Sequence, residues 1–416
     1  MARVLVIGGG SELQPQLRQV ATRIPLPLET VVICRGSSLP HVQKPGENQA
    51  LVVLNDACRT DQWLRAARLL HADWPIDTVA SFADLDQDRA AAIAADLELP
   101  FHTPDTVRMV HDKLAMRARL NESGLEKVPF AAIDSLDGLE RFCAEAGLPV
   151  IVKPSQGWAS SGIGVIREPA QLAQAYRRVV EAEPPLFGRS RPMAERYYEG
   201  REFSVEVITH AGRHYVFAVT EKFSDEQTLV ELGHVVPARL RPGEQALLVE
   251  HVGAALTALG IHTGPTHTEI LLGAEGPIVI ETHLRDAGDE IPRLVEDATG
   301  VDLAELFLRQ VLGVDIGARP ELLERRTGPA YHASGSIAYL APERHGTLAR
   351  IDGWDAVRAR PGVQDAQQLV PDGARLQGLT DSFARLGYVR VRADTSTEAV
   401  TRAQDAVAGL KVRLQE

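Results

Sequence analysis

The chain has 416 residues, of which 44% are hydrophobic and 24% charged, and its formal net charge is -12. This length allows two or three packed lobes, and the composition is that of an ordinary soluble globular protein. The sequence contains no apolar stretch long enough for a membrane span, no basic block that would bind nucleic acid and no CxxC motif. The first residues lack the features of a secretory signal, so we expect a cytoplasmic protein with no membrane or nucleic-acid partner.

Residues 1–104 alternate short β-rich runs, such as RVLVIG and TVVICRG, with helical stretches, such as DQWLRAARLLHA. This alternation predicts parallel strands with crossover helices, as in a Rossmann-like sheet. Gly8, Gly9 and Gly10 follow the first run, but the third glycine of the dinucleotide fingerprint is missing, and Arg35 stands where a dehydrogenase needs an acidic residue. We therefore interpret the glycines as a tight strand-to-helix turn.

Three further segments follow. A predicted helix over TPDTVRMVHDKLAMRARLNESGL begins near Thr103 and Pro104 and leads into residues 105–193, which continue with a helix around SLDGLERFCAEAG and the strand LPVIVKP. Residues 194–327 alternate longer strands with helices, and residues 328–416 contain shorter strand-like pieces and one final helix over STEAVTRAQDAVAGLKVRLQE. These patterns predict a mixed α/β and α+β chain with a central lobe and a small C-terminal α+β lobe.

A lysine, Lys153, ends the apolar run LPVIV and precedes SQGWASSGIG. An ammonium group at the end of a buried strand can contact a phosphate oxygen, and the N–H groups of a small-residue flap that includes Ser160, Ser161 and Gly162 can approach phosphates closely. An ordinary hairpin turn would not explain a lysine after so apolar a run. Lys113 is a second candidate cation, although a lysine on an exposed helix is usually a solvated charge.

The segment AERYYEGREFSVEVI is a candidate nucleoside site. Glu195 and Glu202 can accept hydrogen bonds from an adenine amino group and a ribose hydroxyl, with Tyr197 or Tyr198 packing nearby. Taken alone, the same carboxylates are better explained as solvated charges on an edge strand.

Two carboxylates, Glu269 and Glu281, lie on adjacent predicted strands on either side of the turn from Gly273 to Gly276. Carboxylate oxygens are suitable ligands for Mg²⁺. On an extended strand Glu281, His283 and Arg285 share one face, so Arg285 can stabilise charge on a transferring phosphoryl group or an acyl phosphate. A strand that merely becomes polar as it leaves the core would not explain the pairing with Glu269.

The order of these motifs resembles that of the ATP-grasp proteins, and more narrowly that of the carboxylate–amine ligases of the L-amino acid ligase (dipeptide synthetase) type. The resemblance implies an ATP-grasp fold with an N-terminal parallel-sheet lobe, a central lid lobe and a C-terminal α+β lobe. It implies that Lys113 and Lys153 contact phosphates, residues 157–164 form a flexible loop, Glu195 and Glu202 contact adenine and ribose, Glu269 and Glu281 bind the metal, and Arg285 lies beside the acyl phosphate.

The sequence departs from the family pattern at His283, where many ATP-grasp enzymes have an asparagine that contacts a second metal ion. An imidazole can bind a divalent ion or contact the phosphate, so the number of ions and the role of His283 stay open. Asp289 and Glu290 either belong to the same site or begin the next helix, where acidic residues favour the dipole. His234, in VELGHVVPARL, resembles part of the family's amino-acid pocket, although a lone histidine is more often structural.

The resemblance implies an ATP-dependent ligase that uses one or two Mg²⁺ ions, with Mn²⁺ as an alternative ion. We expect the γ-phosphoryl group of ATP to move to a substrate carboxylate, and an amine to attack the acyl phosphate under a lid that excludes water. The acid is either an α-amino acid or an acidic amino acid activated through its side chain, as in γ-glutamyl-type ligases. A carboxylase or purine-type ligase is more remote, and a non-catalytic nucleotide-binding protein would not need Arg285. We expect small-molecule partners and a homodimer.

Overall fold

The computed structural model describes residues 1–9, 11–157, 162–181 and 190–415. Its N-terminal sheet has the order β3-β2-β1-β4, and all of its strand pairs are parallel. The strands are β1 (Ala2–Ile7), β2 (Leu28–Arg35), β3 (Ala50–Leu54) and β4 (Thr78–Ala80), with helices α1 (Leu13–Arg23), α2 (Thr60–Asp73) and α3 (Gln87–Asp96). Apolar clusters cover both faces of the sheet, which explains why its strands are apolar throughout. The predicted alternation is confirmed.

The long helix expected near residue 113 is instead two helices, α4 (Pro104–His111) and α5 (Lys113–Glu122). Asp112 between them has an extended backbone, and its side chain accepts a hydrogen bond from the Leu114 N–H over 2.9 Å. This N-cap begins a new helix, because an aspartate in that conformation satisfies a free donor of the first turn. As a result Lys113 is the first residue of α5.

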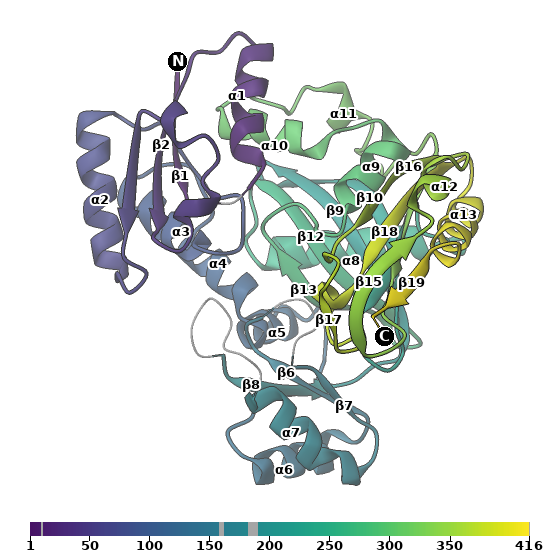
Figure 1. Cartoon of the computed structure of the whole chain (residues 1–416). Helices are drawn as coiled ribbons and strands as arrows, with labels where there is room; N and C mark the ends of the chain where they lie inside the picture. The colour runs from purple at the N-terminus through teal and green to yellow at the C-terminus, as the bar shows by residue number, and fades with distance from the viewer. Residues whose placement is uncertain (10, 158–161, 182–189, 416) are drawn as a thin grey trace.

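A small antiparallel sheet with the order β5-β8-β6-β7 forms the lower lobe in Figure 1, together with α6 (Leu136–Ala146) and α7 (Leu172–Glu181). Its strands are β5 (Phe130–Ala132), β6 (Val150–Pro154), β7 (Gly164–Ile166) and β8 (Pro192–Arg196). Apolar side chains of both helices pack against these strands in one cluster. Lys153 lies near the end of β6, as predicted from the apolar run before it.

The largest sheet has eight strands in the order β13-β12-β9-β10-β11-β14-β18-β16. They are β9 (Gly200–His210), β10 (Arg213–Ser224), β11 (Glu231–Val236), β12 (Gly264–Gly273), β13 (Gly276–His283), β14 (Ser334–Leu340), β16 (Val363–Gln368) and β18 (Gly387–Ala393). Three strands of the C-terminal segment, β14, β16 and β18, thus extend the largest sheet. The sequence had instead suggested that this segment forms a small separate lobe. The two regions share one ladder of hydrogen bonds through β11 and β14.

The sequence predicted a single helix for the last residues, but the structure has a helix followed by a strand. Helix α13 (Ser396–Ala408) is followed by strand β19 (Lys411–Leu414), which joins a second small sheet of order β17-β15-β19. That sheet also contains β15 (Gly346–Asp352) and β17 (Arg375–Leu376). The remaining short helices are α11 (Pro320–Leu323) and α12 (Trp354–Arg358), with 3-10 turns at Leu39–His41, Pro45–Glu47, Pro169–Gln171 and Ser382–Ala384.

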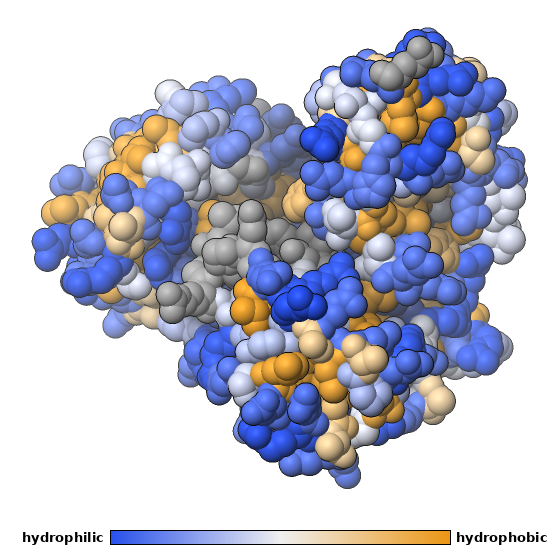
Figure 2. All heavy atoms as spheres, turned by 60° about the horizontal axis from the view of Figure 1, so that its bottom comes forward, coloured by the Kyte–Doolittle hydropathy of each residue, from blue (hydrophilic) through white to orange (hydrophobic). Residues whose placement is uncertain are grey.

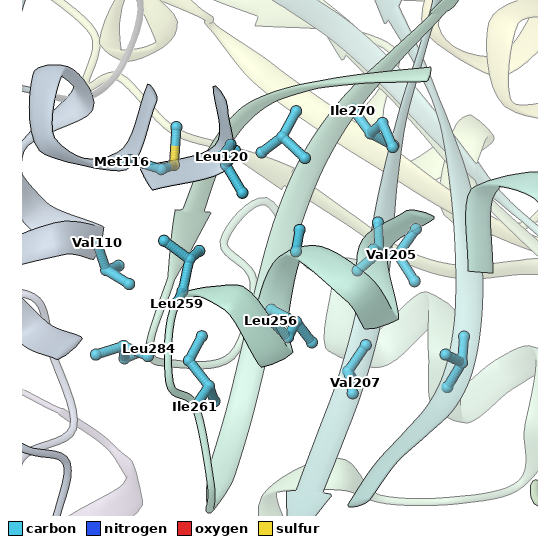
Figure 3. Close-up of a cluster of buried hydrophobic side chains, with 14 of the residues drawn as sticks. Val110, Met116, Leu120, Val205, Val207, Leu256, Leu259, Ile261, Ile270 and Leu284 are labelled. Carbon is cyan, nitrogen blue, oxygen red and sulfur yellow. The ribbon is translucent and has the colours of Figure 1, made fainter. Parts of the chain in front are cut away.

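One face of the large sheet packs on α8 (Glu244–Ala258), and α4 and α5 close the same apolar cluster. Figure 3 shows Met116 and Leu120 of α5 in the same cluster as Leu256 of α8 and Val205 of β9. The opposite face packs on α9 (Ile291–Thr299) and α10 (Leu303–Val311). These clusters fix α5, and with it Lys113, against the strands that carry the predicted carboxylates.

The face in Figure 2 is mostly hydrophilic, with hydrophobic atoms in separate groups. Among the described residues, every helix is too short or too polar to cross a bilayer.

Candidate active site

The register of the large sheet aligns the predicted polar residues. Glu269 of β12 lies directly opposite Glu281 of β13, and His267 lies opposite His283. On the other side of β12, Glu269 pairs with Ser204 of β9. Directly opposed residues of antiparallel strands point to the same face. The predicted adjacency of the two glutamates is therefore confirmed.

A cleft of about 1050 Å³, part of it open to solvent, lies between the small sheet and the large one. Its polar lining includes eight of the predicted site residues: Lys113, Lys153, Glu195, Tyr197, Tyr198, Glu202, Glu269 and Glu281. Its apolar lining includes Val128, Ile151, Leu271, Ile278 and Val279. A slot with apolar walls at one part and convergent charges at another suits a ligand with a flat apolar ring and charged groups.

Lys153 is buried at the base of this cleft and pairs with Glu195. The other carboxylate oxygen of Glu195 lies 3.1 Å from Nε of Arg117, which is buried and also pairs with Glu126. Burial alone would raise the pKa of Glu195, but the charges of Lys153 and Arg117 hold it below its ordinary value. Glu195 is thus a buried counter-ion that fixes Lys153, and its predicted contact with adenine stays a prediction.

Lys113 approaches the cleft from the start of α5. Its Nζ lies 2.6 Å from Oε2 of Glu281 and donates to the carbonyl oxygen of Gly157 over 3.0 Å. Burial opposes ionisation of Glu281, but Lys113 and then His283 keep the pKa of this carboxyl well below its usual range. Glu281 is therefore ionised in the cleft.

A second buried lysine, Lys222 of β10, was missed by the sequence analysis. Its Nζ lies 2.6 Å from Glu231 and 3.6 Å from Glu202, and it also pairs with Glu269. Carboxylate oxygens of these three glutamates lie within 4.8 Å of one another, a spacing that would suit a metal ion. Because the ammonium of Lys222 contacts all three, we interpret them as its counter-ions. The available signal was a lysine shortly after the apolar run YVFAV of the same strand, similar to the signal that identified Lys153.

Burial raises the pKa of Glu202 to about 7; the charge of Lys222 opposes this rise, and those of Glu269 and Glu231 add to it. By contrast, Lys222 and His267 overcome the burial of Glu269 and lower its pKa to about 2. Two carboxylates of one cluster therefore differ in charge near neutral pH, with Glu202 the one that can carry a proton.

Strand β13 ends at His283, so Arg285 lies just beyond it, and both side chains meet Asp84. Oδ2 of Asp84 accepts from Nε of Arg285 over 2.7 Å and lies 3.4 Å from Nδ1 of His283. The other ring nitrogen of His283, Nε2, lies 3.3 Å from Oε1 of Glu281. Both ring nitrogens of His283 thus face carboxylates. Its role as a metal ligand stays a prediction.

Asp84 was also missed by the sequence analysis. It follows β4, at the carboxyl end of the parallel N-terminal sheet, where ligands of open α/β sheets usually bind. That rule was the available signal. Burial would raise the pKa of Asp84, but His283 and Arg285 keep it well below its ordinary value. The N-terminal sheet therefore supplies a charged group to the same site.

Two of the three predicted substrate residues, His234 and Asp289, lie together, and like Arg285 they are outside the cleft lining. Nε2 of the buried His234 is 3.3 Å from Oδ2 of Asp289, which also forms a two-bond ion pair with Arg385. Glu290 directly precedes α9. Of the three predicted flap residues, Gly162 has a φ of +73°, and Ser160 and Ser161 lie outside the described residues.

The donor set fits a hard divalent cation. Glu269 and Glu281 present carboxylates from opposed strand positions, and Mg²⁺ prefers such oxygen ligands. The charge of each glutamate raises the cost of ionising the other, as expected of a pair that can share a cation.

Comparison with known proteins gives two family matches. Residues 146–293 match the ATP-grasp domain, and residues 338–415 match the L-amino acid ligase C-terminal domain 2. An uncharacterised protein of Sinorhizobium fredii, y4rH, is 27% identical over 85% of this chain and 71% of its own length. The alanine–anticapsin ligase of Bacillus subtilis is 27% identical over 47% of this chain and 46% of its own length, so the match spans less than half of that ligase.

The fold is also found among solved structures. The L-amino acid ligase from Bacillus licheniformis superimposes with a TM-score of 0.81 over 100% of this chain and 99% of that one, at 22% sequence identity. This likeness establishes the architecture of the whole chain.

Proposed function

We infer that this chain, which belongs to the ATP-grasp family, is an ATP-dependent ligase that joins an amino-acid carboxylate to an amine. The observation that carries the inference is the direct opposition of Glu269 and Glu281 in a cleft that also contains Lys113 and Lys153. Two anions for a metal and two cations for phosphates are the groups that a bound MgATP needs. The C-terminal domain match and the name of the alanine–anticapsin ligase support an amino acid as one substrate.

The reaction has two steps. A carboxylate oxygen of the acid forms a bond to the γ-phosphorus as the bond to ADP breaks, which gives an acyl phosphate. The amine nitrogen then attacks the acyl carbon, loses a proton, and expels phosphate. One oxygen of the acid therefore ends in the phosphate product.

The side chains divide this work by position. Lys153, fixed by Glu195, and Lys113 lie where they can contact phosphate oxygens as point charges. Arg285, oriented by Asp84, is placed to stabilise charge on the transferring group. The apolar wall of the cleft, with Tyr197, Tyr198 and Glu202, takes the nucleoside.

Glu269 and Glu281 would hold Mg²⁺, which when bound neutralises phosphate charge and polarises the γ-phosphoryl group. We propose one or two ions, with Mn²⁺ able to replace Mg²⁺, since the same carboxylates suit either ion. His283, between Asp84 and Glu281, orients these carboxylates or contacts the second ion. His234 and Asp289 are the proposed amino-acid contacts.

Product analysis tests the function. The full chain is incubated with ATP, Mg²⁺ and all pairs of standard amino acids plus common amines, with measurement of ADP and mass detection of dehydrated conjugates. An acid labelled with ¹⁸O in its carboxylate must transfer one label to phosphate if the acyl phosphate forms. Fragmentation of the conjugate separates α-carboxylate ligation from a γ-glutamyl-type product.

The matched variant is Arg285→Met, which is expected to bind ATP while turnover falls. Tight MgATP binding with no turnover for any pair would contradict the ligase and favour a non-catalytic nucleotide-binding protein. Light scattering of the same sample tests the proposed homodimer.

A further inference from the structure

Arg385 joins the C-terminal part of the chain to the loop that follows strand β13. Its Nη1 and Nη2 donate to Oδ2 and Oδ1 of Asp289 over 2.7 and 2.6 Å, so the guanidinium and the carboxylate meet as two forks. Its Cζ lies 3.8 Å from the ring centroid of Tyr339, and Nη1 also donates to the carbonyl oxygen of Glu231 over 3.3 Å. Only 6% of Arg385 is exposed. These contacts hold the guanidinium in one place.

Asp289 lies on a stretch of unusual backbone. Its φ is +56° and that of Glu290 is +60°, in the left-handed region that residues other than glycine rarely adopt. Such a conformation persists where the surrounding structure fixes it. The ion pair with Arg385 supplies that restraint at the first of the two residues, within the short loop that leads from Arg285 to α9.

Asp289 also contacts the active-site sheet. Its Oδ2 lies 3.3 Å from Nε2 of His234, which is fully buried. His234 is paired in register with Lys222, whose ammonium contacts Glu269. Arg385 therefore restrains, through Asp289, both the loop of Arg285 and a histidine beside the charged cluster.

We propose that Arg385 is a positioning residue for the ligation step: it fixes Asp289, and through Asp289 the loop of Arg285 and the imidazole of His234. This inference rests on the proposed function, because it concerns the placing of groups around the acid and the amine. It gives the C-terminal domain a part in the reaction, since Arg385 lies in the segment that matches that domain.

Arg390 offers a matched control. It lies on β18, shortly after Arg385, and it pairs with Asp297 on α9. The side chains of that pair are 15% and 15% exposed, compared with 7% and 24% for Arg385 and Asp289. Both arginines thus tie the C-terminal segment to the α9 region, but Asp297 lies on the helix rather than on the loop before it.

The first measurement is steady-state ligation by the full chain with Arg385→Met, Arg385→Lys or Arg390→Met. We expect Arg385→Met to lower kcat about 10- to 100-fold, with the Kd for MgATP changed by less than about threefold, because a small misplacement of reacting groups is costly. Arg385→Lys should recover part of the loss, since lysine keeps the charge but not the fork. Arg390→Met should lower kcat by less than about threefold. Equal losses in the two methionine variants would overturn the proposal.

A second measurement does not depend on turnover. The wild-type full chain and its variants, each with isotope-labelled histidine, are compared by NMR. The His234 signal is assigned from a His234→Gln sample. Arg385→Met and Asp289→Asn should move this signal, whereas Arg390→Met should leave it in place. An unmoved His234 signal in Arg385→Met would overturn the proposal even if ligation is seen, and absence of ligation in the wild type alone would count against the proposed function instead. If Arg385→Met does not fold, Arg385→Lys and Asp289→Asn decide the outcome.

Discussion

Nζ of Lys113 lies 2.6 Å from Oε2 of Glu281, where helix α5 begins and strand β13 approaches its end. The lysine is a predicted phosphate contact and the glutamate a predicted metal ligand. Because MgATP carries charges of both signs, each side chain can exchange its partner for the ligand without leaving a buried charge unpaired. Lys113 and Glu281, which are both predicted to contact the ligand, thus neutralise each other's charge within the cleft.

Replacing Glu281 with glutamine tests this arrangement. Glu281→Gln removes one proposed Mg²⁺ ligand and the counter-ion of Lys113, so the Mg²⁺ concentration for half-maximal ADP formation should rise about tenfold or more, as kcat falls. Glu275→Gln, an exposed carboxylate in the turn of the same hairpin, is the control and should leave both values unchanged. An unaltered Mg²⁺ requirement in Glu281→Gln would count against Glu281 as a ligand. The measurement is a titration of ADP release with Mg²⁺.

Sequence patterns predicted the parts of the site that depend on local order. Glu269 and Glu281 are separated by one tight turn, so antiparallel pairing brings them together in a way that strand periodicity can anticipate. Lys153 was found because a buried strand rarely ends in a charge without a partner. The alternation of residues 1–104 was sufficient for the parallel sheet.

The long-range contacts themselves were not predictable from the chain, even where a residue such as Asp84 could have been assigned to a sheet edge. Asp84 and Arg285 are far apart in sequence, and only the docking of the N-terminal sheet brings them within 2.7 Å. The break of the predicted helix at Asp112 depends on a single cap that overrides the helical pattern around it. Arg385 gave no local signal, because its partner Asp289 comes from a different region of the fold.

The contact between Asp84 and Arg285 leads to a second prediction. Asp84→Asn keeps the size of the side chain but removes the charge that orients Arg285, so kcat for ADP formation should fall about 10- to 100-fold. The Kd for MgATP should change by less than about threefold, since neither residue is part of the cleft lining. Asp88→Asn is the control, because Asp88 is half-exposed and pairs with its neighbour Arg89. Loss of MgATP affinity without loss of kcat would assign Asp84 to nucleotide binding instead.

The buried Lys222 leads to a third prediction. Lys222→Met removes the cation shared by Glu202, Glu231 and Glu269, so the free energy of unfolding should fall by about 3–5 kcal/mol. Three carboxylates within 4.8 Å can then share a divalent ion, and Ca²⁺ should recover part of the lost stability because it accepts flexible oxygen ligands. Urea unfolding with and without Ca²⁺ measures both effects. Lys127→Met, at an exposed position, is the control. Full stability of Lys222→Met without Ca²⁺ would show that the glutamates do not need a counter-ion.

The last prediction concerns acid stability and a histidine away from the charged cluster. Burial, with the nearby His111 and His262, lowers the pKa of His102 to about 4. In the unfolded chain its pKa is about 6.5, so between about pH 4 and pH 6.5 the unfolded state binds a proton that the folded state does not bind. The contribution of the neutral His102 to the free energy of unfolding is therefore complete above about pH 6.5 and is lost as the pH falls through about 4.

The shift corresponds to about 3 kcal/mol of the free energy of unfolding across that window. His102→Gln removes the titrating group, so its unfolding free energy should fall less between about pH 6.5 and pH 4 than that of the wild type. Urea unfolding at both ends of the window gives the difference directly, and carboxylates that titrate in the same range cancel in the comparison. His41→Gln, at an exposed position, should keep the wild-type pH dependence. Equal acid sensitivity of the wild type and His102→Gln would mean that His102 is protonated in the folded protein.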